Sequence, residues 1–412
     1  MDTELNFETL GFQPKLLKRL AKQGILKPTP IQEKAIPHVI AGRDVMGLAQ
    51  TGTGKTVAFG LPLIQALLKV GTKPAPKTVR GLILAPTREL ANQIWENLRS
   101  YTGGTHLKVA LIVGGASIGG QIHRLQTGTD LMVATPGRLI DLLDRRAVRL
   151  DCAEYLVLDE ADQMLDMGFI HALRKIAPLL PAERQTLLFS ATMPKQMAEL
   201  AAAYLTDPVR IEAAPPGKPA DKVDQALHFV EQPKKTALLV DYLGKHPDEL
   251  SLVFARTKHG AERLMKALVA KGFAAASIHG NKTQGQRDRA IKGFKQGQYK
   301  VLVATDVAAR GLDIPGVRFV YNFDLPNVPD NYVHRIGRTA RAGQSGSAIA
   351  FCAPTEMGEL KSIQTIIGRQ IEVIGGTPWR SDPAKDDQGK AAKPKRHTRR
   401  RPGRRPRRKL AA

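Results

Sequence analysis

The sequence contains very little cysteine. Only Cys152 and Cys352 occur among 412 residues, far apart and outside any Cys/His spacing typical of a metal site. This pattern excludes a disulfide scaffold and argues against a structural zinc site. A reducing compartment such as the cytoplasm is the expected location.

Long uncharged apolar runs are also missing. No stretch reaches the roughly 18 residues that a membrane-spanning helix needs. The first ten residues carry Asp2, Glu4 and Glu8, which is not the pattern of a signal peptide. The formal net charge is nevertheless +24, so we expect the positive excess to meet nucleic acid and not lipid.

The end of the chain lacks acidic and aromatic side chains. Between Lys390 and Lys409 there are 12 Lys and Arg residues and no acidic residue, and no Phe, Tyr or Trp occurs from Lys390 onward. We predict that residues 376–412 form a disordered basic tail that binds a polyanion by charge, without base stacking. It would act as a tether; the alternative is a solvated tail that only aids solubility.

The remaining chain alternates between short apolar runs and amphipathic stretches, which is typical of parallel sheets covered by helices. A segment rich in Pro, Gly and Ala at 213–222 interrupts this alternation and reads as a linker. We therefore predict an α/β protein with domains at 1–212 and 223–375. The expected strands are Asp44–Leu48, Gly81–Ala85, Val109–Val113, Leu131–Ala134, Tyr155–Asp159, Thr186–Ser190, Leu252–Ala255, Ala275–His279, Val301–Ala304, Phe319–Phe323 and Ser347–Phe351.

A phosphate-binding loop is predicted directly after the first expected strand. Glycines there let backbone N–H groups turn toward phosphate oxygens, and the following helix adds the positive end of its dipole. Lys55 can neutralise the β- and γ-phosphates, and the Thr56 hydroxyl can hold Mg²⁺. Ala49 stands where the first glycine of this pattern usually lies. The loop reads Ala49, Gln50, Thr51, Gly52, Thr53, Gly54, Lys55, Thr56.

An acidic run, Asp159 to Asp162, follows another apolar strand. In this architecture, a carboxylate at the end of a central strand lies beside the phosphate loop. Asp159 is then a candidate Mg²⁺ partner, and Glu160 is placed to orient or deprotonate an attacking water. The four residues alone could be a solvated helix cap, but the phosphate loop favours the functional interpretation.

With these motifs in place, the sequence resembles the DEAD-box ATP-dependent RNA helicases over about residues 7–351, in the style of the bacterial RhlE-like branch. The resemblance implies two RecA-like domains in tandem. The motifs occur in the family's order: Gly24–Gln32 (GILKPTPIQ), Ala49–Thr56 (AQTGTGKT), Pro86–Leu90 (PTREL), Gly114–Gly115 (GG), Thr135–Arg138 (TPGR), Asp159–Asp162 (DEAD), Ser190–Thr192 (SAT), Val253–Thr257 (VFART), Thr305–Asp313 (TDVAARGLD) and His334–Arg341 (HRIGRTAR).

The resemblance also assigns nucleotide contacts. Within a Q motif at 5–33, Gln32 reads adenine and Phe7 stacks on it, although Phe7 could instead be a core aromatic. Asp313 is assigned to the ribose, and Arg338 and Arg341 act as arginine fingers on the γ-phosphate. One departure is Ala340, where the family usually has Gly; its methyl group is tolerated unless this residue needs a positive φ.

The implied RNA contacts come from loops in both domains. Their types hold phosphates and sugars and carry no base code, which predicts sequence-independent binding. For Arg256 and Arg287, an ordinary surface role remains an alternative. The residues are Thr87, Arg88, Gly115, Thr135, Arg138, Arg256, Thr257, Gly280, Arg287, Thr305 and Arg310.

Four further residues are assigned to coupling hydrolysis with domain closure: Asp162, Ser190, Thr192 and His334, with helix capping before Pro194 as the simpler role for the Ser and Thr. The expected activity is RNA-stimulated ATP hydrolysis that separates short duplexes. An ATP-gated RNA clamp or scaffold and a DNA translocase are the alternatives. The pathway stays open between ribosome assembly, messenger decay and cold adaptation.

Overall fold

The computed structural model of this chain describes residues 6–49, 52–193, 195–212, 223–312, 314–340 and 345–379. The predicted linker and nearly all of the predicted tail therefore lie outside the described residues. So do Gln50, Thr51, Asp313 and Arg341. No helix in the described part is long and apolar enough to cross a membrane.

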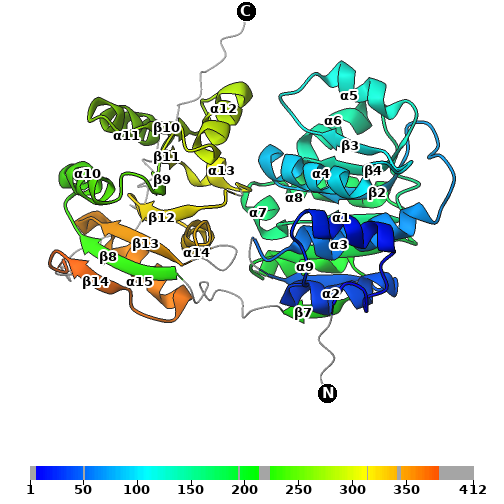
Figure 1. The fold of residues 1–412 in the computed structure, drawn as a ribbon, viewed down its shortest axis with the longest axis horizontal. Coiled ribbons are helices and arrows are strands. Elements are labelled where there is room, and N and C mark those ends of the chain that lie inside the picture. Colours follow the sequence, from blue (N-terminus) through cyan, green and yellow to red (C-terminus); the bar gives the residue numbers. More distant parts are fainter. Residues whose placement is uncertain are drawn as a thin grey trace, which may run out of the picture. The chain divides into compact units, whose positions relative to one another are not determined.

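The first half of the chain builds a seven-stranded, entirely parallel sheet. Its strand order is β3-β4-β2-β5-β6-β1-β7, with β3 and β7 at opposite edges (Figure 1). The strands are β1 (Val45–Leu48), β2 (Val79–Leu84), β3 (Val109–Ile112), β4 (Thr129–Ala134), β5 (Tyr155–Leu158), β6 (Gln185–Ser190) and β7 (Val209–Glu212). The helices are α1 (Pro14–Lys22), α2 (Pro30–Ile40), α3 (Lys55–Leu68), α4 (Arg88–Thr102), α5 (Ile118–Leu125), α6 (Pro136–Asp144), α7 (Ala161–Asp166), α8 (Ile170–Ile176), the 3₁₀ turn η1 (Ala177–Leu179) and α9 (Lys195–Tyr204).

The second half builds another seven-stranded parallel sheet, in the order β10-β11-β9-β12-β13-β8-β14. Its strands are β8 (Val223–Phe229), β9 (Leu250–Phe254), β10 (Ala275–Ile278), β11 (Val301–Ala304), β12 (Val317–Asn322), β13 (Gly346–Cys352) and β14 (Glu372–Gly375). Its helices are η2 (Gln232–Lys234), α10 (Lys235–Lys245), α11 (Lys258–Ala270), α12 (Gln284–Lys295), α13 (Asp306–Ala309), α14 (Asp330–Ile336), η3 (Pro354–Glu356) and α15 (Met357–Ile367).

The two sheets repeat the same strand order. Matching them position by position pairs β1 with β8, β2 with β9, β3 with β10, β4 with β11, β5 with β12, β6 with β13 and β7 with β14. The prediction of two tandem α/β units of parallel strands is confirmed. Each strand in one half therefore has a counterpart that delivers its loop to the same place in the other half.

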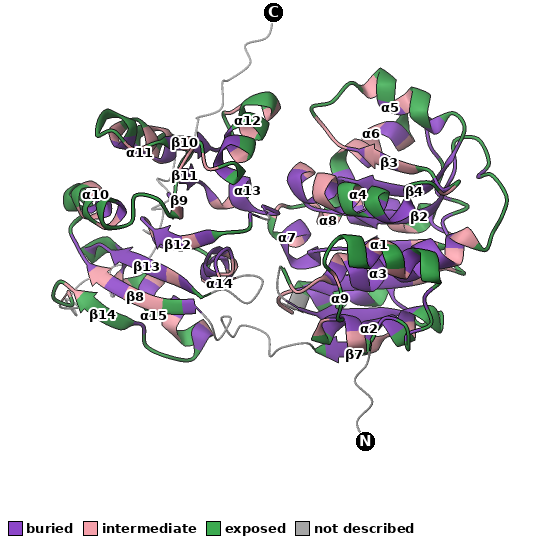
Figure 2. Ribbon diagram, in the orientation of Figure 1, coloured by how far each residue is buried: buried purple, intermediate pink, exposed green. Residues whose placement is uncertain are grey.

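The burial of the central strands explains why they could be predicted from the sequence. β1, β2 and β4 are buried at every position, as Figure 2 shows for β2 and β4. Apart from Arg80, Thr129 and Asp130 near the starts of β2 and β4, their residues are apolar, which gives the apolar runs seen in the sequence.

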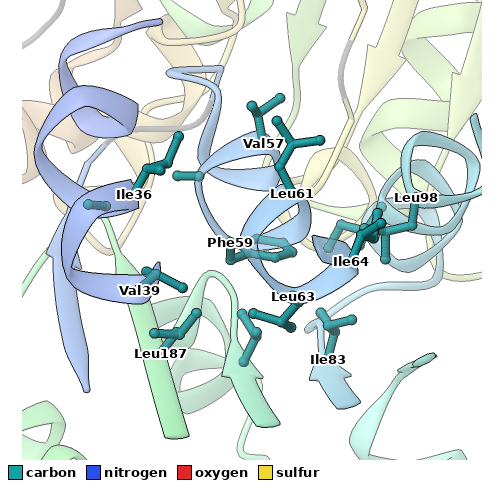
Figure 3. Close-up of a cluster of buried hydrophobic side chains, with 14 of the residues drawn as sticks. Ile36, Val39, Val57, Phe59, Leu61, Leu63, Ile64, Ile83, Leu98 and Leu187 are labelled. Atoms are coloured by element: carbon teal, nitrogen blue, oxygen red, sulfur yellow. The ribbon is translucent and has the colours of Figure 1, made fainter. Parts of the chain in front are cut away.

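Helix α3 packs on this sheet through Phe59, which lies in a cluster with Leu187 and Ile83 (Figure 3). The Phe59 ring centroid lies 5.7 Å from that of Phe189. Gly47 makes this approach possible, because a Cβ there would come within 2.6 Å of the Phe189 ring.

Three strands were not predicted: β7, β8 and β14. β7 and β14 are the outer strands on one side of their sheets, and their residues are largely exposed or half-buried. β8 mixes buried, half-buried and exposed positions and contains the exposed Asp224 and the half-buried Gln225. Because these strands lack a continuous apolar run, the criterion that located the central strands missed them.

The backbone at Ala340 has a φ of 54°, in the left-handed region. Because φ is positive here, the methyl group of Ala340 is unfavourable. An L-residue in this region costs about 1–2 kcal/mol. Glycine relieves the strain but adds unfolded-state entropy worth about 0.5–1 kcal/mol.

We expect Ala340→Gly to raise the free energy of unfolding by about 0.5–1 kcal/mol. Urea unfolding of the purified protein measures the change. The matched control is Ala202→Gly on the exposed side of α9, which should lower stability by about 1 kcal/mol. A loss of stability in both variants would contradict the strain at Ala340.

Candidate nucleotide and RNA site

All strands of a parallel sheet point the same way, so the loops after them meet at one edge. The phosphate loop follows β1, the SAT motif follows β6 and the acidic run follows β5, and these three strands are neighbours in the sheet. This is where ligands bind in open α/β sheets.

The phosphate loop is shaped by glycines and held by the Q motif. Gly52 and Gly54 have φ values of 85° and 89°, which side chains rarely adopt. The Gln32 amide donates to the Gly54 carbonyl at 2.9 Å, and the Thr29 hydroxyl donates to the Thr53 carbonyl at 2.7 Å. Gln32 thus contacts the loop through its side chain; its predicted contact with adenine stays a prediction.

The charged centre of the site is buried. Lys55 Nζ lies 3.8 Å from Asp159 Oδ1 and donates to the Ala49 carbonyl at 3.1 Å. Both side chains are less than a tenth exposed. Burial raises the pKa of the Asp159 carboxyl to about 6, which the Lys55 charge opposes and the neighbouring Glu160 charge supports.

Glu160 combines burial with an unusual backbone. Its residue is 2% exposed, and its φ and ψ of 51° and 52° lie in the left-handed region. Its backbone N–H donates to Asp159 Oδ1 at 3.0 Å. Strain of this kind, about 1–3 kcal/mol, clusters at functional sites.

The SAT motif is bonded to the acidic run. Asp162 Oδ2 accepts from the Thr192 hydroxyl at 3.0 Å and from the backbone N–H groups of Ala191 and Thr192 at 3.1 and 2.9 Å. Ser190 donates to the Thr192 carbonyl. The Thr192 hydroxyl therefore links the SAT motif to the acidic run. The alternative role, helix capping before Pro194, involves a residue outside the described part.

Motif residues of the second half form hydrogen bonds with one another. Arg335 forms two bonds to Asp306, at 2.5 and 2.8 Å, and is 2% exposed. Arg338 donates to the Leu312 carbonyl at 2.5 Å. His334 Nε2 lies 3.9 Å from Asp162 Oδ2, which links this cluster to the acidic run.

The predicted RNA residues occupy matching positions in the two halves. Thr87 is the third residue after β2 and caps α4 by accepting from Leu90 N; Thr257 is the third after β9 and caps α11 by accepting from Gly260 N. Thr135 directly follows β4, and Thr305 directly follows β11. Such helix starts present backbone N–H groups to phosphates.

A pocket of about 620 Å³ brings many of these residues together. Those predicted from the sequence that line it are Thr87, Arg88, Thr135, Arg138, Gly280 and Arg287. Gly115 lies outside this set but lines a neighbouring pocket with Arg88. Its φ is 78°, and a Cβ there would clash with the Arg88 guanidinium.

Acidic side chains already hold several of the predicted RNA arginines. Arg287 lies 3.0 Å from Glu89, and Arg310 lies 2.9 Å from Asp166. Burial raises the pKa of the Asp166 carboxyl, and the Arg310 charge opposes this. Glu89 and Asp166 were not singled out from the sequence: Glu89 lies inside PTREL but its partner is distant in the chain, and Asp166 carries no motif signal.

Phe7 is 4% exposed and packs against Phe12, with ring centroids 6.4 Å apart. It belongs to the buried cluster of this half, and its predicted stacking on adenine stays a prediction. Thr56 is half-buried at the start of α3, and its predicted contact with Mg²⁺ stays a prediction.

Two family models and a relative of known activity match this chain. The DEAD/DEAH box helicase model matches residues 29–200, and the helicase conserved C-terminal domain matches residues 234–343. The chain is 44% identical over 373 residues to the ATP-dependent RNA helicase CshA of Listeria monocytogenes, covering 90% of this chain and 71% of that protein.

Solved structures show the same likeness. Saccharomyces cerevisiae Dbp5 bound to RNA and ADP BeF3 matches with a TM-score of 0.80 and 32% identity, covering 90% of this chain and 95% of that one. Mss116p bound to ssRNA and AMP-PNP matches with a TM-score of 0.82 and 28% identity, covering 92% and 81%.

The raised pKa of Asp159 gives a signed pH dependence. The folded protein binds a proton at Asp159 between about pH 4 and pH 6 that the unfolded chain has released, so this group's contribution to stability falls as pH rises through that window. We expect Asp159→Asn to flatten this part of the profile of unfolding free energy against pH. Asp151→Asn, at an exposed carboxyl, is the control and should leave the slope unchanged.

Proposed function

This chain belongs to the DEAD/DEAH box helicase family, and from that membership we propose that it is an ATP-dependent RNA helicase that separates short duplexes locally or remodels RNA–protein complexes. The observation that carries the proposal is the convergence of phosphate loop, acidic run and SAT motif after three neighbouring strands. We place the activity in the cytoplasm; the RhlE-like branch stays a prediction.

The nucleotide end of the reaction follows from the buried charges. Lys55 is placed to exchange its Ala49 carbonyl for phosphate oxygens, while Glu160 orients the attacking water. Asp159 and Thr56 would hold Mg²⁺, which when bound neutralises charge developing on the phosphates. The donor set fits, because a carboxylate and a hydroxyl are ligands that Mg²⁺ prefers.

The second half supplies the complementary charge. Arg338 and Arg341 are proposed as the fingers that stabilise the transferring phosphoryl group, which is worth about 10³–10⁵ in rate in related reactions. Asp313 is proposed to bind the ribose. Hydrolysis then requires groups from both sheets at one nucleotide, which makes the rate sensitive to anything that fixes the two halves together.

RNA can fix the two halves together through arginines that form ion pairs with acidic residues in its absence. Phosphates bound at Thr87, Thr135 and their counterparts compete with Glu89 and Asp166 for Arg287 and Arg310. The basic tail adds a tether, which raises the local concentration of RNA without a base code.

Two alternatives use the same motifs. An ATP-gated clamp would bind RNA but release few duplex strands, so a duplex-release assay with ATP against a non-hydrolysable analogue separates it from a helicase. A DNA translocase would be stimulated equally by single-stranded DNA, so the ATPase rates with RNA and with DNA decide that point.

We expect Glu160→Gln to lower the RNA-stimulated ATPase rate by about 10²–10⁴-fold, since the base that positions water is lost. The variant should retain RNA in the presence of ATP, measured by fluorescence anisotropy. Glu183→Gln, on an exposed loop of the same half, should behave like the unchanged protein. Normal turnover by the Glu160 variant would remove this residue from its assigned role.

We expect removal of residues 378–412 to weaken RNA binding most at low salt, because these residues carry 14 of the chain's Lys and Arg residues. The slope of log affinity against log salt should become shallower. The shortened protein should keep its ATPase rate at saturating RNA, since the motifs all precede residue 342. An unchanged salt slope would show that the tail is only a solubilising segment.

A further inference from the structure

Lys235 of the second half occupies the position that Lys55 occupies in the first. β8 corresponds to β1 in the common strand order, and the next α-helix after each strand begins with a lysine, Lys55 in α3 and Lys235 in α10. Lys55 Nζ lies 3.8 Å from Asp159, which follows β5. Lys235 Nζ lies 3.7 Å from Asp324, which follows the corresponding strand β12.

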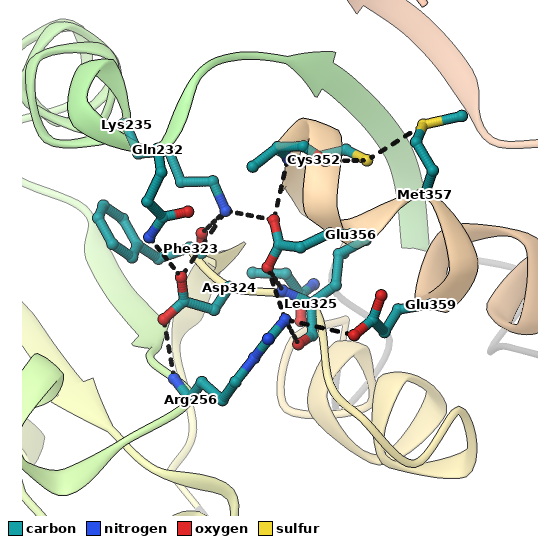
Figure 4. A network of polar contacts seen from close by, with 12 residues as sticks. Gln232, Lys235, Arg256, Phe323, Asp324, Leu325, Cys352, Glu356, Met357 and Glu359 are labelled. Carbon is teal, nitrogen blue, oxygen red and sulfur yellow. Dashed lines mark hydrogen bonds and ion pairs between the residues drawn. The ribbon is translucent and has the colours of Figure 1, made fainter. Parts of the chain in front are cut away.

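The two halves differ in the anionic group that contacts this lysine. Glu356 lies in η3, after β13, the counterpart of the strand that precedes the SAT motif. Its carboxylate accepts from Lys235 Nζ at 2.5 Å, as a phosphate would from Lys55 (Figure 4). The second half therefore carries an internal carboxylate beside the lysine that corresponds to Lys55.

This carboxylate is fully engaged. Oε2 accepts from Lys235 Nζ and from Ala353 N at 2.9 Å, while Oε1 accepts from Arg256 Nη2 at 2.8 Å and from Leu325 N at 3.0 Å. The Glu356 side chain is 3% exposed and that of Lys235 is fully buried. A buried ion pair is stable only when its remaining hydrogen-bonding capacity is satisfied, as it is here.

Arg256 is tied to this cluster at two levels. Its guanidinium donates to Glu356 and to the Leu325 carbonyl, and its backbone N–H donates to Asp324 Oδ2 at 2.9 Å. If the guanidinium moved to an RNA phosphate, Lys235 alone would face the charges of the buried Glu356 and of Asp324, whose side chain is 14% exposed. The net negative charge left behind in a buried site makes that exchange costly.

The repeat of the fold points the same way. Thr257 matches Thr87, each the third residue after its strand, so Arg256 matches Pro86 and Lys258 matches Arg88. Arg256 thus stands at a position where the first half has no basic side chain. The predicted phosphate contact at this loop fits the position of Lys258 better.

We propose that Glu356, with Lys235 and Asp324, is a self-filled counterpart of the phosphate site that positions the RNA-binding loop after β9, and that Arg256 is a tie within it and not a phosphate ligand. The inference rests on the proposed RNA binding. Its consequence is that Thr257 and the start of α11 are held ready for RNA before RNA arrives, which lowers the entropy lost on binding.

The salt dependence of RNA binding tests this directly. Each phosphate contact to a single strand contributes about 0.7 to the slope of log affinity against log salt. For Arg256→Gln in the full chain, with a labelled single-stranded RNA and a non-hydrolysable ATP analogue, we expect the slope to stay unchanged. The dissociation constant should rise by about three- to tenfold, from loss of the loop's order.

Arg138→Gln is the matched control, because Arg138 lines the RNA pocket beside Thr135. It should make the slope shallower by about 0.7. Glu356→Gln should raise the dissociation constant with an unchanged slope; should it fail to fold, Arg256→Gln still decides. A shallower slope for Arg256→Gln, or an unchanged dissociation constant, overturns the inference. No RNA binding by the unchanged protein would overturn the proposed function itself.

Discussion

The parallel direction of every strand is the constraint on which the rest of this molecule depends. Because the carboxyl ends of the strands meet at one edge of each sheet, residues far apart in the sequence are delivered to a common place. The phosphate loop, the acidic run and the SAT motif meet because the strands that they follow are neighbours and run in the same direction. The same rule, applied to an identical strand order, places the threonines predicted to contact RNA at corresponding positions in the two halves.

Within that frame, the two halves use the same buried position in opposite ways. In the first half, Lys55 and Asp159 lie beside the glycine-containing loop predicted to bind phosphate, and burial raises the pKa of Asp159 to about 6. In the second half, Glu356 supplies the anion from within the chain. The same topology thus gives one lysine predicted to bind a phosphate and one lysine whose charge is neutralised by a carboxylate of the chain.

Much of the fold and of the candidate site could be predicted because each motif lies within a few residues of a buried strand. The central strands are buried continuously, and the phosphate loop follows one of them within a few residues. The outer strands β7 and β14 were missed because their exposed residues carry no continuous apolar run. The strain at Ala340 was foreseen only as a condition, since φ is not encoded in residue type for alanine.

Pairings across long separations were beyond reach for a different reason. Arg256 and Glu356 are 100 residues apart, and their contact depends on which strand ends are neighbours in the sheet. A basic residue in a motif suggests a phosphate ligand when its surroundings are unknown. Once the strand order is known, the same arginine has a buried carboxylate beside it, and its charge is already committed. The partner therefore decides what an arginine in a recognised motif does, and the topology decides the partner.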